Sequence, residues 1–243
     1  ANAQYCTYIG YRTGAYVDDG LENTAVGAFA LMSSDSAGQS ANYNVAMGYR
    51  ALGDIHDGDN NTAIGYYAGR FNGHEAADNN VFVGFKAGIN GDSDLPNGNY
   101  IATSVAVGAL SMGGNSGASV ASITGGNNTC VGYSSGGQIE GAGSDNTLIG
   151  SGAADSLTTG ANNVVMGKSA MQSATTTGDN VIIGSQACDA MAAGQTTTNG
   201  TVAIGRQSLN ALTSGAGNIA IGYQSLLENT DGAHNTVLGY QAM

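Results

Sequence analysis

One short motif recurs thirteen times along this 243-residue chain. It consists of Asn, a β-branched residue, two apolar residues, Gly, two variable residues and a small residue. Intervals between successive motif glycines are 17, 21, 17, 19, 24, 24, 18, 17, 17, 21, 17 and 17 residues, so the basic unit is 17 residues with insertions. A unit this short cannot bury an apolar side alone, and it must therefore stack on its neighbours. The motif glycines are Gly10, Gly27, Gly48, Gly65, Gly84, Gly108, Gly132, Gly150, Gly167, Gly184, Gly205, Gly222 and Gly239.

The residues before each glycine indicate a short β-strand. Thr, Val or Ile stands three places before the glycine in every copy, and Ile, Val, Met or Leu stands directly before it. Because side chains alternate along a strand, these two positions share one face, which we expect to point into the core. The position between them is also apolar in every copy and is expected on the opposite, outer face. A strand that is apolar on both faces normally has both faces covered, most simply by another copy of the chain.

The positions around the glycine predict a tight corner in each repeat. The residue three places after the glycine is always Ala, Ser or Thr, which indicates close approach of two backbones. The glycine is expected to supply a positive φ or a place with no room for a Cβ atom. The insertions follow the small residue, and so they are predicted to be turns on one edge of the stack.

Asparagine begins ten of the thirteen motifs, and Cys6, Ser104 and Thr201 replace it in the others. Stacked repeats would place these amides in a ladder, where each can bond turn backbone groups or the next amide. The alternative is that these asparagines lie in separate surface turns. The constant position of Asn in the motif favours the ladder over this alternative. The ladder asparagines are Asn23, Asn44, Asn61, Asn80, Asn128, Asn146, Asn163, Asn180, Asn218 and Asn235.

Together these features predict an all-β fold, a parallel β-solenoid or β-roll of about thirteen 17-residue coils. We expect one repeat domain over residues 1–243, with the largest inserted loops around 90–100 and 113–126. At about 4.8 Å per coil, thirteen coils make a rod of roughly 60 Å. A homotrimer lets three identical strands cover one another's second apolar face. The open coils at both ends predict either flanking sequence or end-to-end stacking.

Three copies of the motif carry a resemblance to a known family: Asn61-Thr-Ala-Ile-Gly-Tyr-Tyr-Ala-Gly69, Asn218-Ile-Ala-Ile-Gly-Tyr-Gln-Ser-Leu226 and Asn235-Thr-Val-Leu-Gly-Tyr-Gln-Ala-Met243. They resemble repeats of bacteriophage tail fibres and, less closely, the head repeats of trimeric autotransporter adhesins, which are shorter. Both resemblances imply parallel β-rolls assembled as homotrimers on a virion or cell surface. Neither names a receptor.

Composition argues against several other functions. Eighteen acidic and six basic residues give a net charge of −12, which disfavours binding to nucleic acid or to anionic membranes. No apolar run is long enough to insert into a membrane. The three cysteines are widely separated and suggest neither a disulfide framework nor a zinc site. The histidines lie in variable segments without a nucleophile signature, so we expect no enzyme and no cofactor.

Two groups of loop residues are candidates for binding. Asp54, Asp57 and Asp59 could offer oxygen ligands to calcium, although they do not complete the twelve-residue calcium loop, and solvated turns are the favoured interpretation. Asp92, Asp94, Asn97 and Tyr100 lie in a long insertion and are the candidate receptor contacts. Aromatic residues after seven of the glycines predict packing between coils or subunits, with sugar stacking as the alternative.

The leading hypothesis is therefore a structural fibre protein, a phage tail fibre shaft or receptor-binding rod that attaches to a host surface glycan or protein. A cell-surface trimeric adhesin head and a self-assembling extracellular filament are the alternatives. All three place the chain on a virion, outside the cell or on its surface.

Overall fold

The computed structural model describes residues 4–33, 40–70, 77–89, 101–113, 125–139, 141–191 and 198–243, which form an all-β parallel β-solenoid. No helix occurs in these ranges, and so none that could span a membrane. The chain forms two compact units, residues 1–127 and residues 128–243. The first holds β1 (Thr7–Ile9), β2 (Thr24–Val26), β3 (Val45–Met47), β4 (Thr62–Ile64), β5 (Val81–Val83) and β6 (Val105–Val107). The second holds β7 (Thr129–Val131), β8 (Thr147–Ile149), β9 (Val164–Met166), β10 (Val181–Ile183), β11 (Val202–Ile204), β12 (Ile219–Ile221) and β13 (Thr236–Leu238).

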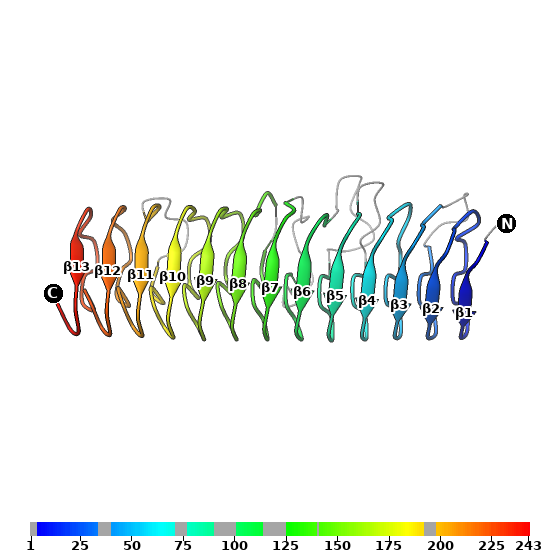
Figure 1. The fold of residues 1–243 in the computed structure, drawn as a ribbon, viewed down its shortest axis with the longest axis horizontal. Helices are drawn as coiled ribbons and strands as arrows, with labels where there is room; N and C mark the ends of the chain where they lie inside the picture. The colour runs from blue at the N-terminus through cyan, green and yellow to red at the C-terminus, as the bar shows by residue number, and fades with distance from the viewer. Residues whose placement is uncertain are drawn as a thin grey trace. The chain divides into compact units, whose positions relative to one another are not determined.

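Within each unit the strands lie side by side in chain order, parallel and in register (Figure 1). Thr7 pairs with Thr24 and Thr24 with Val45 in the first unit, as Val164 pairs with Val181 in the second. Each motif position therefore stacks on the same position of the next coil. The repeat in sequence becomes a set of columns in space.

Hydrogen bonds between coils continue beyond the strands. The Gly27 N–H donates to the Ile9 carbonyl at 2.8 Å, and the Phe29 N–H donates to the Tyr11 carbonyl at 2.8 Å. Bonds in the turns run to both neighbours, because the N–H two places after the glycine donates to the preceding coil and the N–H four places after it donates to the following coil. Each inner coil is thus held on several sides, which satisfies backbone groups that three-residue strands alone would leave unpaired.

The two faces of the strands are oriented opposite to the sequence-based expectation. The middle residue of each strand from β2 to β12 is buried, and Phe82, Leu148 and Ile182 have no exposed surface. The residues on either side of it are exposed or partly exposed, so the prediction that they fill the core is wrong. The reason is strand parity: the motif asparagine lies two places before the middle residue, and both point into the coil.

Two further columns complete the core of each unit. Leu31, Leu52 and Met112 stand four places after the motif glycine and are fully buried. Aliphatic residues seven places after it, such as Ile55 and Leu157, are buried as well. The small residues three places after the glycine line the remaining space, because the interior is too narrow for larger side chains there.

Large and small core residues compensate for one another across the coil. The ring of Phe82 lies against Gly69 and Gly88, and a Cβ atom on Gly69 would be 2.6 Å from the nearest ring carbon. In the coil of β3, by contrast, the middle residue is Ala46 and the opposing residue is Leu52. These two coils therefore divide the interior differently between the two columns.

Non-glycine residues adopt the left-handed backbone conformation at fixed points of the coil. In the coil of β3 these are Tyr43 (φ 58°), Arg50 (φ 52°), Leu52 (φ 49°) and Asp54 (φ 65°). The conformation costs roughly 1–2 kcal/mol for an L-residue, and inter-coil bonds offset this cost. The Arg50 N–H donates to the Ala28 carbonyl at 3.1 Å and the Leu52 N–H donates to the Ala68 carbonyl at 2.9 Å. Left-handed residues thus turn successive N–H groups toward opposite neighbours.

Candidate functional site

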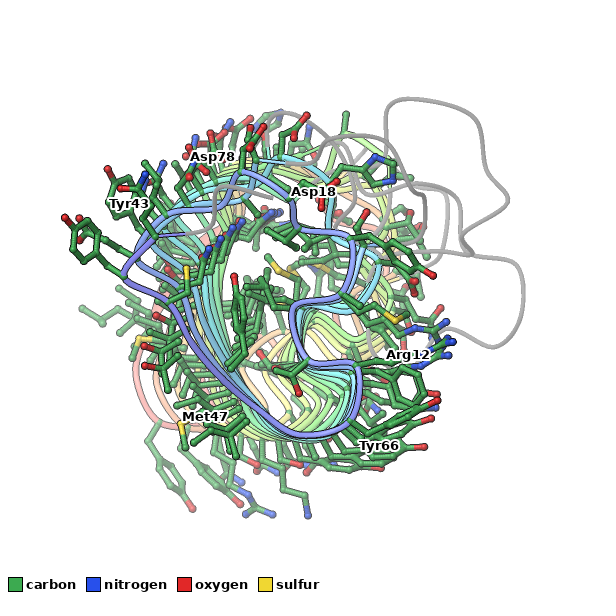
Figure 2. All side chains as sticks on the ribbon, turned by 90° about the vertical axis from the view of Figure 1, so that its right-hand side faces the viewer. Arg12, Asp18, Tyr43, Met47, Tyr66 and Asp78 are labelled. Carbon is green, nitrogen blue, oxygen red and sulfur yellow. The ribbon has the colours of Figure 1, made fainter. Side chains whose placement is uncertain are left out.

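The outward face of the strands is an uncharged, mainly apolar surface in both units. Each strand contributes two outward residues, and of these 26 positions twenty are aliphatic or Met, six are Thr and none is charged or an amide. Met47 is 44% exposed and Ile64 40% in the first unit, and Ile219 is 38% exposed in the second. Figure 2 shows Met47 on this face, between Tyr43 on one side and Tyr66 on the other. A contiguous apolar surface of this kind marks an interaction site.

One side of this face carries aromatic rings in the first unit. Tyr11, Phe29, Tyr49, Tyr66 and Phe85 follow one another along the coils, with centroids of successive rings 5.3, 5.9, 5.5 and 5.4 Å apart. The last three are nearly parallel, with interplanar angles of 16° and 8°. Stacked rings cover each other's faces and leave their edges to solvent, which favours packing between coils over sugar stacking.

The corresponding edge of the second unit carries amides in place of most rings. The Gln224 side chain donates to Gln207 Oε1 at 3.0 Å, and the Gln241 side chain donates to Gln224 Oε1 at 2.9 Å. Tyr223 and Tyr240 still stack, with centroids 5.1 Å apart. Side chains of both units therefore form ladders on this edge, through different chemistry.

Five cations lie on the same edge. We call the residues one and two places after each motif glycine the basic edge, because these 26 positions hold five bases and no acid. Several of the bases lie over the rings, as Arg50 lies 5.3 Å from the Phe29 centroid and Arg206 5.8 Å from the Tyr223 centroid. None of the five forms an ion pair with any residue that the structure describes. The bases are Arg12, Arg50, Lys86, Lys168 and Arg206.

The other side of the strand face is acidic. We call the residues five and six places before each motif glycine the acidic edge, because these 26 positions hold five acids and neither Lys nor Arg. Three of the acids are exposed, and the other two are half-buried, where Asp59 Oδ1 accepts the Asn42 N–H and Asp78 Oδ1 accepts the Asp59 N–H, both at 2.7 Å. The acids are Glu22, Asp59, Asp78, Asp145 and Asp179.

The motif asparagines form hydrogen-bonded ladders inside both units. Asn61 is fully buried, its N–H donates to Asn44 Oδ1 at 2.8 Å, and its Nδ2 donates to the Ala77 carbonyl at 2.7 Å. Its Oδ1 accepts both the N–H and the Nδ2 of Asn80, at 3.0 and 2.9 Å. The second unit repeats these contacts at Asn146, Asn163, Asn180 and Asn235. Each amide thus donates to a backbone carbonyl of a turn and holds the next coil in register.

The substituted ladder positions keep part of this bonding. The Ser104 N–H donates to Asn80 Oδ1 at 3.0 Å, and the Thr201 N–H donates to Asn180 Oδ1 at 2.9 Å. At Cys6 the sulfur accepts the Asn23 N–H at 3.4 Å. The backbone N–H of the next ladder position therefore donates to the preceding ladder side chain, whichever residue occupies the substituted position.

The motif glycines form a second column along each unit. Gly132 has a φ of 135°, and a Cβ atom there would lie 2.6 Å from the Gly150 carbonyl oxygen. Both the φ and the close approach require glycine. The same arrangement recurs at Gly27, Gly48, Gly65, Gly84, Gly150, Gly167, Gly184, Gly205 and Gly222, and Gly10 also abuts its successor.

The candidate calcium ligands already have protein partners. Asp54 Oδ2 pairs with Arg70 Nε at 3.0 Å, Asp57 Oδ1 accepts the Ser40 N–H at 2.9 Å, and Asp59 bonds Asn42. Within the described ranges no three His, Cys, Asp or Glu side chains are grouped as a metal site requires. The candidate receptor contacts Asp92, Asp94, Asn97 and Tyr100 lie outside the described residues.

The cysteines do not form a reactive group. All three are free, and Cys130 and Cys188 are buried in the core of the second unit. Burial raises the pKa of Cys130 to about 12 and also raises the pKa of Cys188. Both thiols are therefore neutral packing residues at physiological pH.

Comparison of the chain with protein-family models, with curated proteins and with solved structures finds no match. The chemistry of the surface, an apolar strand face between a basic and an acidic edge, must carry the functional argument.

Proposed function

We propose that this chain is a structural fibre protein, a homotrimeric segment of a phage tail fibre that serves as a shaft or receptor-binding rod. The observation that carries the proposal is the outward strand face. It repeats in every coil, holds no charge and lies exposed in one chain, so assembly would bury it. The motifs quoted above, which resemble tail fibre repeats, supply the assignment to phage.

Threefold assembly suits this face. The strands are in register, so each copy can offer one part of its face to one neighbour and the rest to the other. Burial of apolar area contributes roughly 25 cal/mol per Å², and the contribution accumulates with every coil. The rod would then present its turn insertions laterally toward a host glycan or protein.

Sedimentation equilibrium tests the assembly. We expect three times the 24.1 kDa mass of one chain. A variant with Ile64→Lys and Met166→Lys, one outward residue in each unit, should sediment as a monomer that still melts cooperatively. Asp19→Lys with Ser173→Lys, both exposed and away from the strands, is the matched control and should remain trimeric. A wild-type chain that sediments as a monomer would contradict the proposal.

Immunogold labelling tests the biological assignment. Antibodies raised against the purified chain should label fibres of virions in a lysate of the source culture. Labelling of the bacterial envelope without labelling of virions would instead favour the adhesin alternative.

A further inference from the structure

We infer that neighbouring copies of this chain pair through charge, with the basic edge of one copy against the acidic edge of the next. The inference rests on the proposed assembly through the outward strand face and adds the pairing of its two charged edges. The partner of this surface is a second copy of the same chain.

Charge is distributed unevenly over the two edges. The chain has only six Lys and Arg residues against eighteen acids, yet five of the six bases lie on the basic edge and no acid lies there. Five acids occupy the acidic edge without a Lys or Arg among them. The concentration of five of the six bases in 26 of the 243 positions is a specific feature of the surface.

The two edges of one chain cannot meet each other. They lie on opposite sides of the outward strand face, as Tyr43 and Tyr66 show for the acidic and basic edges in Figure 2. The five bases accordingly form no ion pair with a described residue of their own chain. A second copy with its strand face packed against the first can supply the missing carboxylates.

The positions of the charges along each unit agree with pairing in register. In the first unit Arg12 belongs to the coil of β1 and Glu22 to the coil of β2, while Lys86 and Asp78 share the coil of β5. In the second, Asp179 in the coil of β10 lies one coil from both Lys168 and Arg206. One coil is about 4.8 Å, which the long side chains of Lys and Arg can span.

The charges also select the direction of packing. When two strand faces meet with their chains parallel, the basic edge of one lies across from the acidic edge of the other. When the chains are antiparallel, basic faces basic and acidic faces acidic, and like charges held together oppose association. In a closed ring of parallel copies every basic edge meets an acidic edge, because each copy has one edge of each kind.

Charge exchange on six exposed residues tests this inference. The acidic triple Glu22→Lys, Asp145→Lys, Asp179→Lys and the basic triple Arg12→Glu, Lys168→Glu, Arg206→Glu should each lose the oligomer in sedimentation. The variant with all six substitutions restores complementarity and should regain it. The control changes charge away from both edges and should assemble as the wild type does. It carries Asp18→Lys, Asp19→Lys, Glu228→Lys and Asp231→Lys.

A second measurement reads the polarity directly. Chains labelled at the N-terminus with a donor or an acceptor fluorophore, mixed and reassembled, should show strong energy transfer. Circular dichroism melting verifies that each variant is folded. Should a triple fail to fold, the neutral set Glu22→Gln, Asp145→Asn and Asp179→Asn replaces it, and its assembly should be weaker and less sensitive to NaCl than that of the wild type.

The outcomes separate the inference from the proposed function. A monomeric wild-type chain contradicts the proposed assembly, and the inference with it. An oligomeric wild type whose triples also assemble, or whose sixfold variant does not, overturns the inference alone. An oligomer whose N-terminal labels show no transfer contradicts the threefold assembly as well, because copies related by a threefold axis are parallel.

Discussion

At the scale of single residues, the side chain of the ladder asparagine Asn163 takes part in four hydrogen bonds. Asn163 is buried, accepts from Asn180 through both N–H and Nδ2, and donates to Asn146 and Thr177. Asn163→Leu leaves these groups unpaired in the interior, and we expect it to reduce the free energy of unfolding by about 1–3 kcal/mol. Urea titration followed by circular dichroism measures the change.

The neighbouring Asn162 provides the control for this substitution. It is exposed and has a φ of 60°, so Asn162→Gly keeps the backbone conformation and removes no buried partner. Equal stability of both variants and the wild type would show that the amides do not hold the coils together.

The glycine column gives a sharper prediction. Gly132→Ala brings a Cβ atom to 2.6 Å from the Gly150 carbonyl at a φ of 135°, and we expect a loss of about 3 kcal/mol. Gly200 also has a positive φ, 71°, but no atom lies within 4 Å of the position that a Cβ atom would occupy there. Gly200→Ala should therefore cost only about 1 kcal/mol. Thermal melting of the two variants compares them, and a smaller loss at Gly132 would refute the close-approach explanation.

At the scale of the coil, core volume can be moved from one column to another. Phe82→Ala removes a fully buried ring and should cost about 3–5 kcal/mol. Gly88→Leu alone should also destabilise, because the new side chain overlaps the Phe82 ring. The double variant recreates the arrangement of Ala46 and Leu52, and it should recover most of the loss. Chemical denaturation of the wild type, both single variants and the double variant measures the free energy of unfolding of each. If the double variant loses as much as the two single variants together, the compensation is contradicted.

The sequence predicts the coil but assigns its faces incorrectly. Parallel stacking and in-register columns follow from the invariant spacing of Asn, the strand residues and Gly. Because the strand is apolar on both faces, hydrophobicity alone cannot decide which face is inside. Parity decides it: Asn61 and Ala63 are two places apart, so a ladder inside the coil requires the middle residue inside too.

Other features left weaker signals in the sequence. The core column that includes Leu31 and Leu52 is interrupted by Gly69 and Gly88, which hides its periodicity. Some left-handed positions hold Asn or Asp, which favour that conformation, but others hold Tyr, Arg and Leu, which do not, so only the inter-coil bonds reveal the latter. The charges of the two edges could be read from the sequence, but their positions beside an exposed apolar face could not.

At the scale of the whole molecule, the coil is the unit of stability. Deletion of residues 164–180 removes one complete 17-residue coil and joins Asn163 to Val181, which keeps every column in register. The shortened chain should fold and melt cooperatively, at a temperature only slightly lowered, since each coil contacts only its neighbours. Deletion of residues 164–172 removes about half a coil and should prevent native folding of the second unit. Circular dichroism and hydrogen exchange distinguish the two, and equal behaviour would refute a coil-by-coil architecture.

The hydrogen bonds between coils have a mechanical consequence. They run along the direction of stacking, so a pull on the chain ends opens them one coil at a time instead of loading them together. Each released 17-residue coil adds about 60 Å of extended chain, and a coil with an insertion adds more, so a unit yields in a series of small steps. Under compression the coils already touch and cannot shorten. Each unit on its own therefore resists compression better than tension. Association with other copies would let it bear tension.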